Sequence, residues 1–478
     1  MAVATDVNRV GTEAGMRATN RIGVLAAAVL LAGVAPPLLG AQDTERARLV
    51  AKLDSLARAH VADSLVAGAA VGVVHRGDTL LLAGFGVADL EWDVPTSTDA
   101  VFEIGSVTKQ FTAASVLQLV EQGKLDLDAD VATYLPDYDT RGRRIPLRRL
   151  LDHTSGIKGY TEMPVFGEFM MRDLPRDSLV AKFEAEPLDF EPGTAEIYNN
   201  SAYFLLGLII EKASGEKYEE YVKRHLFEPL GMARSYYCDE RAVVPRRAHG
   251  YDQGPQGLGQ KGYLDHQWPY AAGSLCSTAG DMVRWNQALH GGKVLSAASY
   301  RDMTTPDPLE DGTPIRYGMG LMAFDDNGRR ALTHGGGING FLSDAWYYPD
   351  EGLIVVVLQN SAGQKGPGLL ARALIEAAIG PGTPPAAGTF EGDLSKLAGT
   401  YRGPGRGREM TVEVSVEGGA LAIKPVGAPT PIKPLYRDGL RWQAGNAFWM
   451  FDAFPDGRAS ALRMDTGGGH FVLRRVEG

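Results

Sequence analysis

The chain has 478 residues, of which 44% are hydrophobic and 22% charged, a composition typical of globular proteins with apolar material for more than one core. Its formal net charge is −10, so the phosphate backbone of nucleic acids and anionic membrane surfaces would repel it. We therefore expect about two domains and no nucleic-acid partner.

The first 41 residues have the pattern of a targeting segment. Arg17 and Arg21 precede an apolar run that begins at Ile22, and small residues follow at Gly40 and Ala41. This order is typical of a secretory signal peptide, with cleavage expected after Ala41. A Pro-Pro pair interrupts the run, which is short for a spanning helix, so a retained anchor is the less favoured alternative. We predict a periplasmic or secreted protein with no stable membrane insertion after cleavage.

The next region alternates strand and helix patterns. A helix is predicted over 43–62, and a hairpin over 68–92 that turns at Arg76-Gly77-Asp78. Further predicted elements are apolar helices over 106–122 and 199–214, strands over 317–324, 341–349 and 352–360, and a closing helix over 368–380. Strands at both ends of the region flank its helices. We therefore predict an α+β fold, with one antiparallel sheet flanked by helices and beside an all-helical region.

A segment rich in Pro, Gly and Ala separates this region from the rest. We predict a signal peptide over 1–41, a first domain over 42–380, a linker over 381–389 and a second domain over 390–478. In the second domain, alternating segments are separated by turn residues every eight to twelve positions, which predicts a small all-β, barrel-like domain.

Cys238 and Cys276 are the only cysteines and lie 38 positions apart. In an exported protein an even number of cysteines is compatible with a disulfide. Two buried thiols acting as small apolar groups are the alternative, and the sequence leaves both open.

Three Ser-x-x-Lys pairs occur in the chain: Ser106/Lys109, Ser155/Lys158 and Ser214/Lys217. Glycines interrupt the second pair and the third lies at a helix stop, so we interpret both as solvated loop residues. The first pair opens an apolar helix, and helical periodicity places Lys109 in the middle of the apolar arc.

A buried ammonium group is costly unless it has partners or loses its proton, and both conditions suit a group that activates the Ser106 hydroxyl. Unpaired N–H groups at the helix start would stabilise an oxyanion there. The alternative is that Lys109 snorkels past its apolar neighbours beside an N-capping serine.

Two further segments offer catalytic groups. Tyr198 and Asn200 lie at the start of the apolar helix over 199–214, and a phenol near a lysine can act as a general base. His334 is followed by Gly335, Gly336 and Gly337, glycines that let a backbone edge approach a ligand closely.

The ordered set Ser106-x-x-Lys109, Tyr198-x-Asn200 and His334-Gly335-Gly336 resembles the serine β-lactamase and penicillin-binding-protein superfamily, in the branch close to class C β-lactamases and their esterase relatives. The segments "LLDHTSGI", "FLLGLIIEKASG" and "HLFEPLGM" add to the resemblance, which covers about residues 45–380.

This resemblance implies that Ser106 is the acylated nucleophile, that Lys109 is its proton partner and that Tyr198 is the base that activates first Ser106 and later a water. Whether Tyr198 or Lys109 takes the first proton stays open. Asn200 and His334 would contact the substrate. The N–H groups of Ser106 and Gly337, beside Gly336, would form the oxyanion hole. The segment that starts near "LAGTYRGP" is similar to the lipocalin-like domain of some of these hydrolases, where its role is open.

One departure bears on the substrate. True β-lactamases of this branch usually carry Lys-Thr-Gly where this chain has His334-Gly335-Gly336. A histidine is mostly neutral at pH 7, so efficient penicillin hydrolysis is not expected, and an uncharged or differently charged substrate fits better. We predict an exported serine hydrolase, of esterase or D-amino-acid-peptidase type, that acts through an acyl-enzyme on a small-molecule or peptide substrate.

The alternatives are a true β-lactamase, a D-Ala-D-Ala carboxypeptidase, or a non-catalytic binder of cell-wall peptides. α/β-Hydrolase lipases need a Gly-x-Ser-x-Gly elbow, which this chain lacks. The nine histidines show no His-x-x-x-His or His-Glu-x-x-His spacing, so neither a metal nor another cofactor is expected. The sequence does not determine the oligomeric state.

Overall fold

The computed structural model describes residues 39–476. The predicted signal peptide lies outside them except for its last three residues, where helix α1 (Leu39–His60) begins. The described residues from 46 onward belong to one compact unit, and every site discussed below lies within it.

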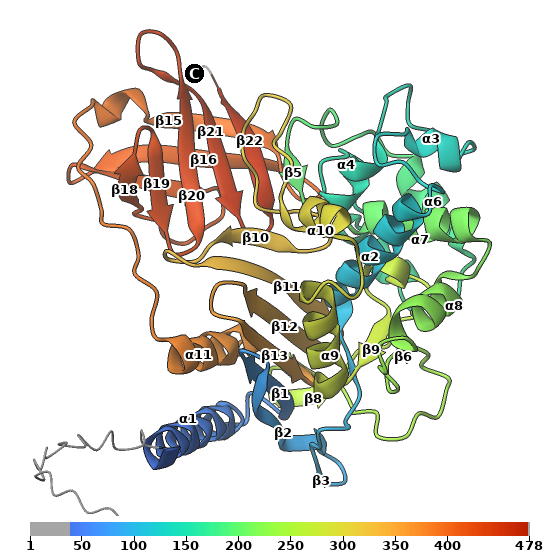
Figure 1. Cartoon of the computed structure of the whole chain (residues 1–478). Helices are drawn as coiled ribbons and strands as arrows, with labels where there is room; N and C mark the ends of the chain where they lie inside the picture. The colour runs from blue at the N-terminus through green and yellow to red at the C-terminus, as the bar shows by residue number, and fades with distance from the viewer. Residues whose placement is uncertain (1–38, 477–478) are drawn as a thin grey trace, which may run out of the picture. The chain divides into compact units, whose positions relative to one another are not determined.

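A seven-stranded sheet is the centre of the first domain (Figure 1), with strand order β10-β11-β12-β13-β1-β2-β3. Its strands are β1 (Gly68–His75), β2 (Asp78–Asp89), β3 (Val94–Pro95), β10 (Met322–Asp325), β11 (Arg330–Ile338), β12 (Phe341–Tyr348) and β13 (Leu353–Gln359). Neighbouring strands are antiparallel, and β1, from the start of the domain, pairs with β13 from its end. The predicted hairpin and the sheet built from both ends are confirmed.

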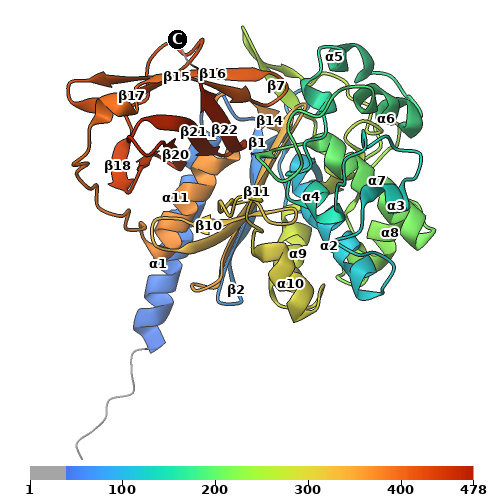
Figure 2. The ribbon, with the colours of Figure 1, turned by 90° about the horizontal axis from the view of Figure 1, so that it is seen from above.

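The two faces of this sheet are covered by different helices (Figure 2). Successive side chains of a strand point to opposite faces. Val71 and Val73 of β1 accordingly pack with α11 (Pro367–Ile379) and with residues of α1, while Ala70 and Val74 pack in the cluster that includes α9 (Ala279–His290). Both faces are therefore buried.

The helical region lies beside the sheet. Its helices are α2 (Thr108–Glu121), α3 (Val131–Tyr134), α4 (Leu147–Leu151), α5 (Phe166–Phe169), α6 (Arg176–Glu184), α7 (Asn200–Ser214), α8 (Tyr218–Val222) and α10 (Ala297–Thr304). The remaining short strands outside the C-terminal domain are β4 (Phe102–Glu103), β5 (Glu196–Ile197), β6 (Tyr236–Tyr237), β7 (Tyr251–Gly254), β8 (Gly257–Gln260), β9 (Leu275–Ser277) and β14 (Ser361–Ala362). Helix α7 ends at Gly215, which has φ 76°, as its sequence predicts.

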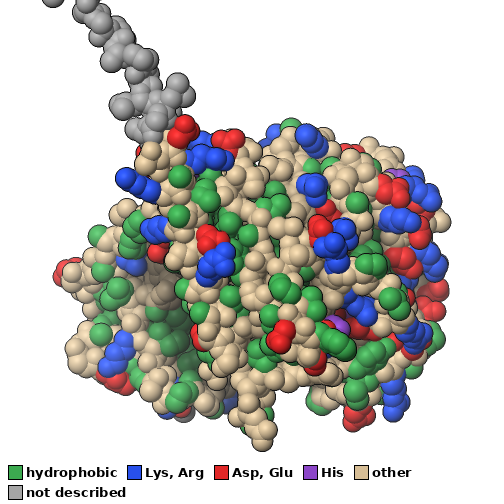
Figure 3. Space-filling view, turned by 90° about the horizontal axis from the view of Figure 1, so that it is seen from below, with side chains coloured by type: hydrophobic (Ala, Val, Ile, Leu, Met, Phe, Trp, Pro, Cys, Tyr) green, Lys and Arg blue, Asp and Glu red, His purple; other side chains and the backbone are tan. Residues whose placement is uncertain are grey.

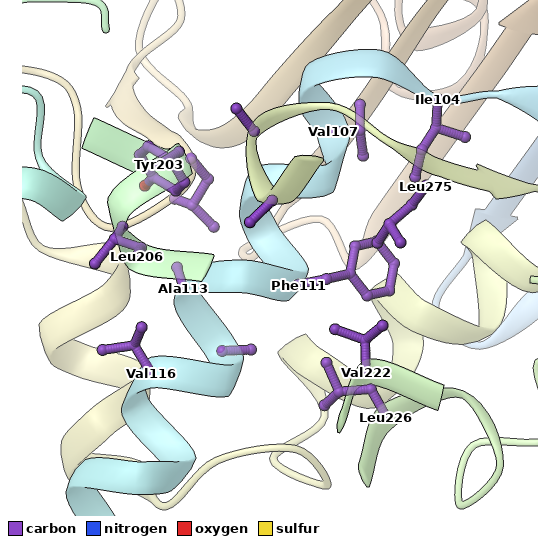
Figure 4. Packing of buried hydrophobic residues seen from close by; sticks show 14 of the residues in the cluster. Ile104, Val107, Phe111, Ala113, Val116, Tyr203, Leu206, Val222, Leu226 and Leu275 are labelled. Atoms are coloured by element: carbon purple, nitrogen blue, oxygen red, sulfur yellow. The ribbon is translucent and has the colours of Figure 1, made fainter. Parts of the chain in front are cut away.

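Helix α2 is the buried axis of this region (Figure 4). Phe111 points toward Val222 and Leu226 on one side of the helix, while Val116 points toward Leu206 of α7 on the other. Phe111 is fully buried, and its ring stacks on Trp285 with a centroid distance of 3.9 Å. Apolar packing on both sides fixes the helix that begins just after the predicted nucleophile.

The C-terminal domain is a curved antiparallel sheet rather than a fully closed barrel. Its strands are β15 (Gly399–Pro404), β16 (Glu409–Glu417), β17 (Ala420–Pro425), β18 (Leu435–Asp438), β19 (Arg441–Ala444), β20 (Ala447–Ala453), β21 (Ala459–Thr466) and β22 (Gly469–Arg475). The strand order runs from β17 to β18, and these two edge strands do not pair with each other in the described chain. Trp442, Trp449 and Phe451 fill its core.

The two domains are joined by backbone pairing and by ion pairs. Strand β22 pairs with β5 of the helical region, opposing His470 to Glu196. Arg316, which precedes β10, lies 2.7 Å from Asp465 of β21, and both side chains are nearly buried. Between α11 and the short turn η5 (Leu394–Lys396) the chain has no helix or strand. The domain limits at 380 and 390 stay a prediction.

Cys238 and Cys276 form a disulfide, which decides between the two alternatives left open by the sequence. On the face shown in Figure 3, acidic and basic side chains are interspersed rather than gathered by sign. None of the helices within the described residues combines the length and apolarity needed to cross a bilayer.

Candidate active site

Ser106 lies in the short turn η1 (Gly105–Val107), and α2 begins two residues after it. The sequence placed Ser106 in the first turn of the helix itself, and this placement is wrong by about half a turn. The 3-10 turn leaves Ser106 half-buried beside the helix start, while Lys109, one α-helical turn further, is completely buried. The predicted pair is therefore brought together, with Nζ of Lys109 3.3 Å from Oγ of Ser106.

Lys109 has two other partners. Its Nζ donates to Oδ1 of Asn200 and to the carbonyl oxygen of Ala272, both at 2.8 Å. Burial, and secondarily the positive charge of Arg406, lowers the pKa of Lys109 well below its usual value. A neutral amine has two N–H donors and one lone pair. The two acceptors take the donors, and the lone pair is left for the Ser106 hydroxyl.

Tyr198 follows β5 and precedes α7, so both neighbouring elements fix its position. Lys109 Nζ lies 4.7 Å from the centroid of the Tyr198 ring. The hydroxyl of Tyr198 is buried and has no hydrogen-bond partner of good geometry among the described residues. Burial raises the pKa of Tyr198, while the nearby Ser106 hydroxyl and the Arg406 charge act in the opposite direction. The phenol is therefore protonated in the resting site.

His334 is buried on β11, with both ring nitrogens engaged. Its Nδ1 lies 2.6 Å from the carbonyl oxygen of Gly335, which can only accept, so Nδ1 carries the proton. Its Nε2 then accepts from the hydroxyl of Tyr317 at 2.8 Å. Burial and the Lys109 charge lower the pKa of His334 to about 3. The sequence predicts a neutral histidine at this position, and the hydrogen bonds to Gly335 and from Tyr317 match the neutral form.

Gly336 and Gly337 line the same hollow as Ser106, a pocket of about 540 Å³ that also contains Tyr198, Asn200 and His334. A Cβ atom on Gly336 would lie 2.1 Å from the carbonyl oxygen of Ile104. Only glycine therefore lets β11 approach the turn that carries the serine. The predicted residues come together at one place, from the start of α2, the start of α7 and β11.

A second hollow of about 140 Å³ adjoins Ser106 on its other side. Its apolar lining residues are Tyr160, Phe166, Leu264, Pro269, Ala272 and Ile338. Ser106, Asn200 and Gly337 border both hollows. A substrate bound at Ser106 thus adjoins two hollows, the smaller of which is lined mainly by apolar residues.

The other two Ser-x-x-Lys pairs are not sites of this kind. Ser155 is 1% exposed, so the interpretation of it as a solvated residue is wrong, and Lys158 pairs with Asp189 at 2.7 Å. Ser214 is half-buried at the end of α7, where its hydroxyl donates to the carbonyl oxygen of Ile210 at 2.6 Å. Neither lysine contacts its serine, because a glycine or a helix end separates them.

Two clusters of potential metal ligands occur among the described residues, and one of them is largely buried. Glu103, Glu240 and His266 bring potential ligand atoms within 4.8 Å of one another. The ammonium group of Lys261 contacts both carboxylates of this cluster. A lysine ammonium group therefore already pairs with the carboxylates that a metal ion would need.

Comparison with known proteins identifies the family. The family model described as Beta-lactamase matches residues 53–379. The chain belongs to the beta-lactamase family. A putative penicillin-binding protein, PbpX, of Bacillus subtilis is 35% identical over 249 residues, covering 52% of this chain and 60% of that protein. A D-aminopeptidase of Gluconobacter oxydans is 29% identical over 362 residues, covering 74% of this chain and 66% of that protein.

Each of these two alignments thus spans less than two thirds of the curated relative. Among solved structures, the octameric penicillin-binding-protein homologue from Pyrococcus abyssi is 26% identical with a TM-score of 0.62. That match covers 88% of this chain and 99% of the other. The predicted superfamily and its α+β fold are confirmed.

Three residues of the site escaped the sequence analysis. Tyr317 donates to His334, and Thr161 accepts from Nδ2 of Asn200 at 3.1 Å. Arg406, from the C-terminal domain, lines the pocket of Ser106. Tyr317 lies in a segment predicted as a strand, and no motif marks the other two, because only the fold brings them to the serine.

Proposed function

We propose that this member of the beta-lactamase family is a serine hydrolase that cleaves amide bonds through an acyl-enzyme on Ser106. The observation that supports it most is the placement of Lys109 Nζ, which lies 3.3 Å from Ser106 Oγ and is held by two acceptors. A lysine with a lowered pKa beside a hydroxyl is the arrangement that activates a nucleophile.

In the proposed reaction the lone pair of Lys109 accepts the Ser106 proton while Oγ attacks the substrate carbonyl carbon. The N–H groups of Ser106 and Gly337 stabilise the oxyanion. When the carbon–nitrogen bond breaks, the Tyr198 hydroxyl gives its proton to the leaving nitrogen and regains one from Lys109. A water molecule then gives a proton to the neutral Lys109 amine and attacks the ester carbonyl carbon. The bond from that carbon to Ser106 Oγ breaks, Oγ regains the proton from Lys109, and the carboxylic acid leaves. The pKa directions favour Lys109 over Tyr198 as the first acceptor.

The D-aminopeptidase relative supports an amide of a D-amino acid as the substrate class. The apolar hollow beside Ser106 suits an apolar side chain on the acyl group. Esters, which have a better leaving group, are proposed as additional substrates, in keeping with the class C-like branch that the motifs resemble.

Export is part of the proposal. The N-terminal pattern predicts a signal peptide, and the disulfide between Cys238 and Cys276 supports an oxidising compartment such as the periplasm or the exterior. Fractionation of cells that express the full chain would test it, since recovery of the uncleaved protein in the cytoplasm contradicts export.

The acyl-enzyme is tested with a fluorophosphonate probe and mass spectrometry. The wild-type protein should carry the adduct on Ser106, and the Ser106→Ala variant should carry none. D-aminoacyl p-nitroanilides should be hydrolysed faster than their L counterparts by wild type and not by the variant. Absence of any adduct would instead support a non-catalytic binder.

A further inference from the structure

Arg406 reaches the active site from the other domain. It lies in the turn between β15 and β16, and it lines the pocket that contains Ser106 and Tyr198. Its guanidinium carbon lies 5.1 Å from the centroid of the Tyr198 ring. Its Nη2 lies 2.6 Å from Oε1 of Glu162, a residue of the helical region. The C-terminal domain thus places a permanent positive charge beside the proposed proton donor.

The turn that carries Arg406 is fitted to the first domain. Gly407 has φ +71°, and a Cβ atom there would lie 2.2 Å from Cβ of Glu162. Any other residue would therefore move the turn away from the site. Within the turn, the N–H of Gly405 donates to the carbonyl oxygen of Arg408 at 2.9 Å. These contacts hold Arg406 in place rather than leaving it on a free loop.

A second turn of the same domain reaches the pocket. Gly467, between β21 and β22, lines it, and the carbonyl oxygen of Gly468 accepts from the N–H of Tyr198 at 3.2 Å. Two turns of the C-terminal domain therefore form part of the pocket wall on the side of Tyr198.

Arg406 is the only Arg or Lys side chain among the described residues that line this pocket. Lys109 lies behind Ser106, with its donors engaged and its pKa lowered, and His334 is neutral. A guanidinium has five N–H donors. Glu162 contacts one nitrogen, and the Arg406 side chain is 42% exposed, so donors remain for a ligand.

We propose that Arg406 binds a carboxylate on the leaving group, so that the C-terminal domain selects amides whose leaving group is an amino acid with a free carboxylate. This inference rests on the proposed acyl-enzyme function. Tyr198 would protonate the leaving nitrogen, so the leaving amino acid would lie next to Tyr198. Arg406 lies over the Tyr198 ring and is therefore placed to bind the carboxylate of that leaving amino acid. Because position 334 is a histidine rather than a lysine, the sequence indicated no fixed positive charge in the pocket. In the structure Arg406 supplies that positive charge from another part of the chain.

The test compares two N-acyl D,D-dipeptides that differ only at the C-terminus, one a free acid and one a primary amide. Wild type should hydrolyse the acid with the higher kcat/KM. Arg406→Ala should lower the acid-to-amide ratio of kcat/KM by roughly 10- to 100-fold, the range expected for a hydrogen bond to a charged group. Loss of the Arg406 charge near Lys109 and Tyr198 acts on both substrates alike and cancels in this ratio. Arg408→Ala, in the same turn and exposed, is the matched control and should behave as wild type.

Equal rates on acid and amide in the wild type, or equal losses on both in Arg406→Ala, would overturn the inference. Arg406→Gln keeps the size and polarity of the side chain, so it repeats the test if the alanine variant is unstable. It should lose the same preference.

Fluorophosphonate labelling separates this inference from the proposed function. An N-acyl D-amino acid should protect Ser106 from labelling better than its amide does, and Arg406→Ala should remove the difference. Labelling without carboxylate-dependent protection overturns the role of Arg406 alone. Failure to label Ser106 overturns the acyl-enzyme, and the role of Arg406 with it.

Discussion

Nζ of Lys109 lies 2.8 Å from Oδ1 of Asn200, although 91 positions separate the two residues in the chain. The contact joins the start of α2 to the start of α7. It also occupies one N–H donor of Lys109, and the carbonyl oxygen of Ala272 occupies a second. The remaining position on Nζ faces the hydroxyl of Ser106.

Asn200→Asp should change the pH dependence of the reaction. A carboxylate at this distance from Nζ stabilises the ammonium form and raises the pKa of Lys109, which burial keeps low in the wild type. Because the neutral amine is the proposed proton acceptor, activity rises with pH through that pKa. The acidic limb of the kcat/KM profile should therefore move to higher pH, with at least a 10-fold loss at pH 7 that is partly recovered at pH 9.

Asn200→Ala is the control for this prediction. It removes the amide without adding a charge, so its profile should fall without moving to higher pH. If Asn200→Asp lowered activity equally at every pH, Lys109 would not be the group that titrates.

Glu196→Gln should stabilise the protein at high pH. Burial, and then the nearby Asp465 carboxylate, raises the pKa of Glu196 well above its usual value in the folded state. The wild type therefore loses stability as the pH rises from the unfolded-state pKa, near 4.3, through the folded-state value. The variant avoids this loss, so its free energy of unfolding should exceed that of wild type by about 1 kcal/mol or more at pH 8 and equal it at pH 4.

Urea unfolding at the two pH values measures the effect, with the exposed Glu220→Gln as the matched control. A gain of the same size at both pH values would show that the amide packs better and that the carboxyl group of Glu196 does not titrate.

Loss of the disulfide should destabilise the fold without altering the chemistry. The bond closes a loop of 38 positions, and in the loop-entropy model such a link contributes roughly 3–4 kcal/mol. The Cys238→Ser, Cys276→Ser double variant should lose about that much free energy of unfolding. Its kcat below the unfolding transition should match wild type, and a large fall in kcat would instead place the bond in the function of the site.

Phe111→Ala should cost about 3–5 kcal/mol of folding free energy, because it empties the stacked position against Trp285 in a fully buried cluster. Thermal unfolding should show a clearly lowered midpoint. Phe111 and Lys109 lie on the same helix, α2. The rate at which fluorophosphonate labels Ser106, per folded molecule, therefore also reports whether the cavity left by Phe111 displaces Lys109.

Local sequence patterns predicted the groups that belong to one element or its end. Periodicity alone placed Lys109 on a buried arc, and a helix start placed Tyr198 and Asn200. Arg406 could not be predicted, because its neighbours Tyr198 and Glu162 are more than two hundred positions away in the chain and no sequence pattern joins them. The burial of Ser155 was missed for the same reason, since tertiary packing rather than local composition covers that loop.

The same limit applies to the C-terminal domain. The alternating segments predicted the strands of this domain. They did not predict that the edge strands β17 and β18 do not pair with each other in the described chain, or that β22 pairs with β5 of the helical region. Edge pairing depends on what lies beside an edge in space, which the strands' own residues do not encode.

Strand β22 of the C-terminal domain pairs with β5, whose last residue, Ile197, directly precedes Tyr198 in the chain. Removing the C-terminal strands to obtain a minimal enzyme would leave the main chain at Glu196 and Ile197 without its neighbours and release the tyrosine that they hold. Exchanging the C-terminal module between homologues would therefore alter both the catalytic rate and the substrates accepted.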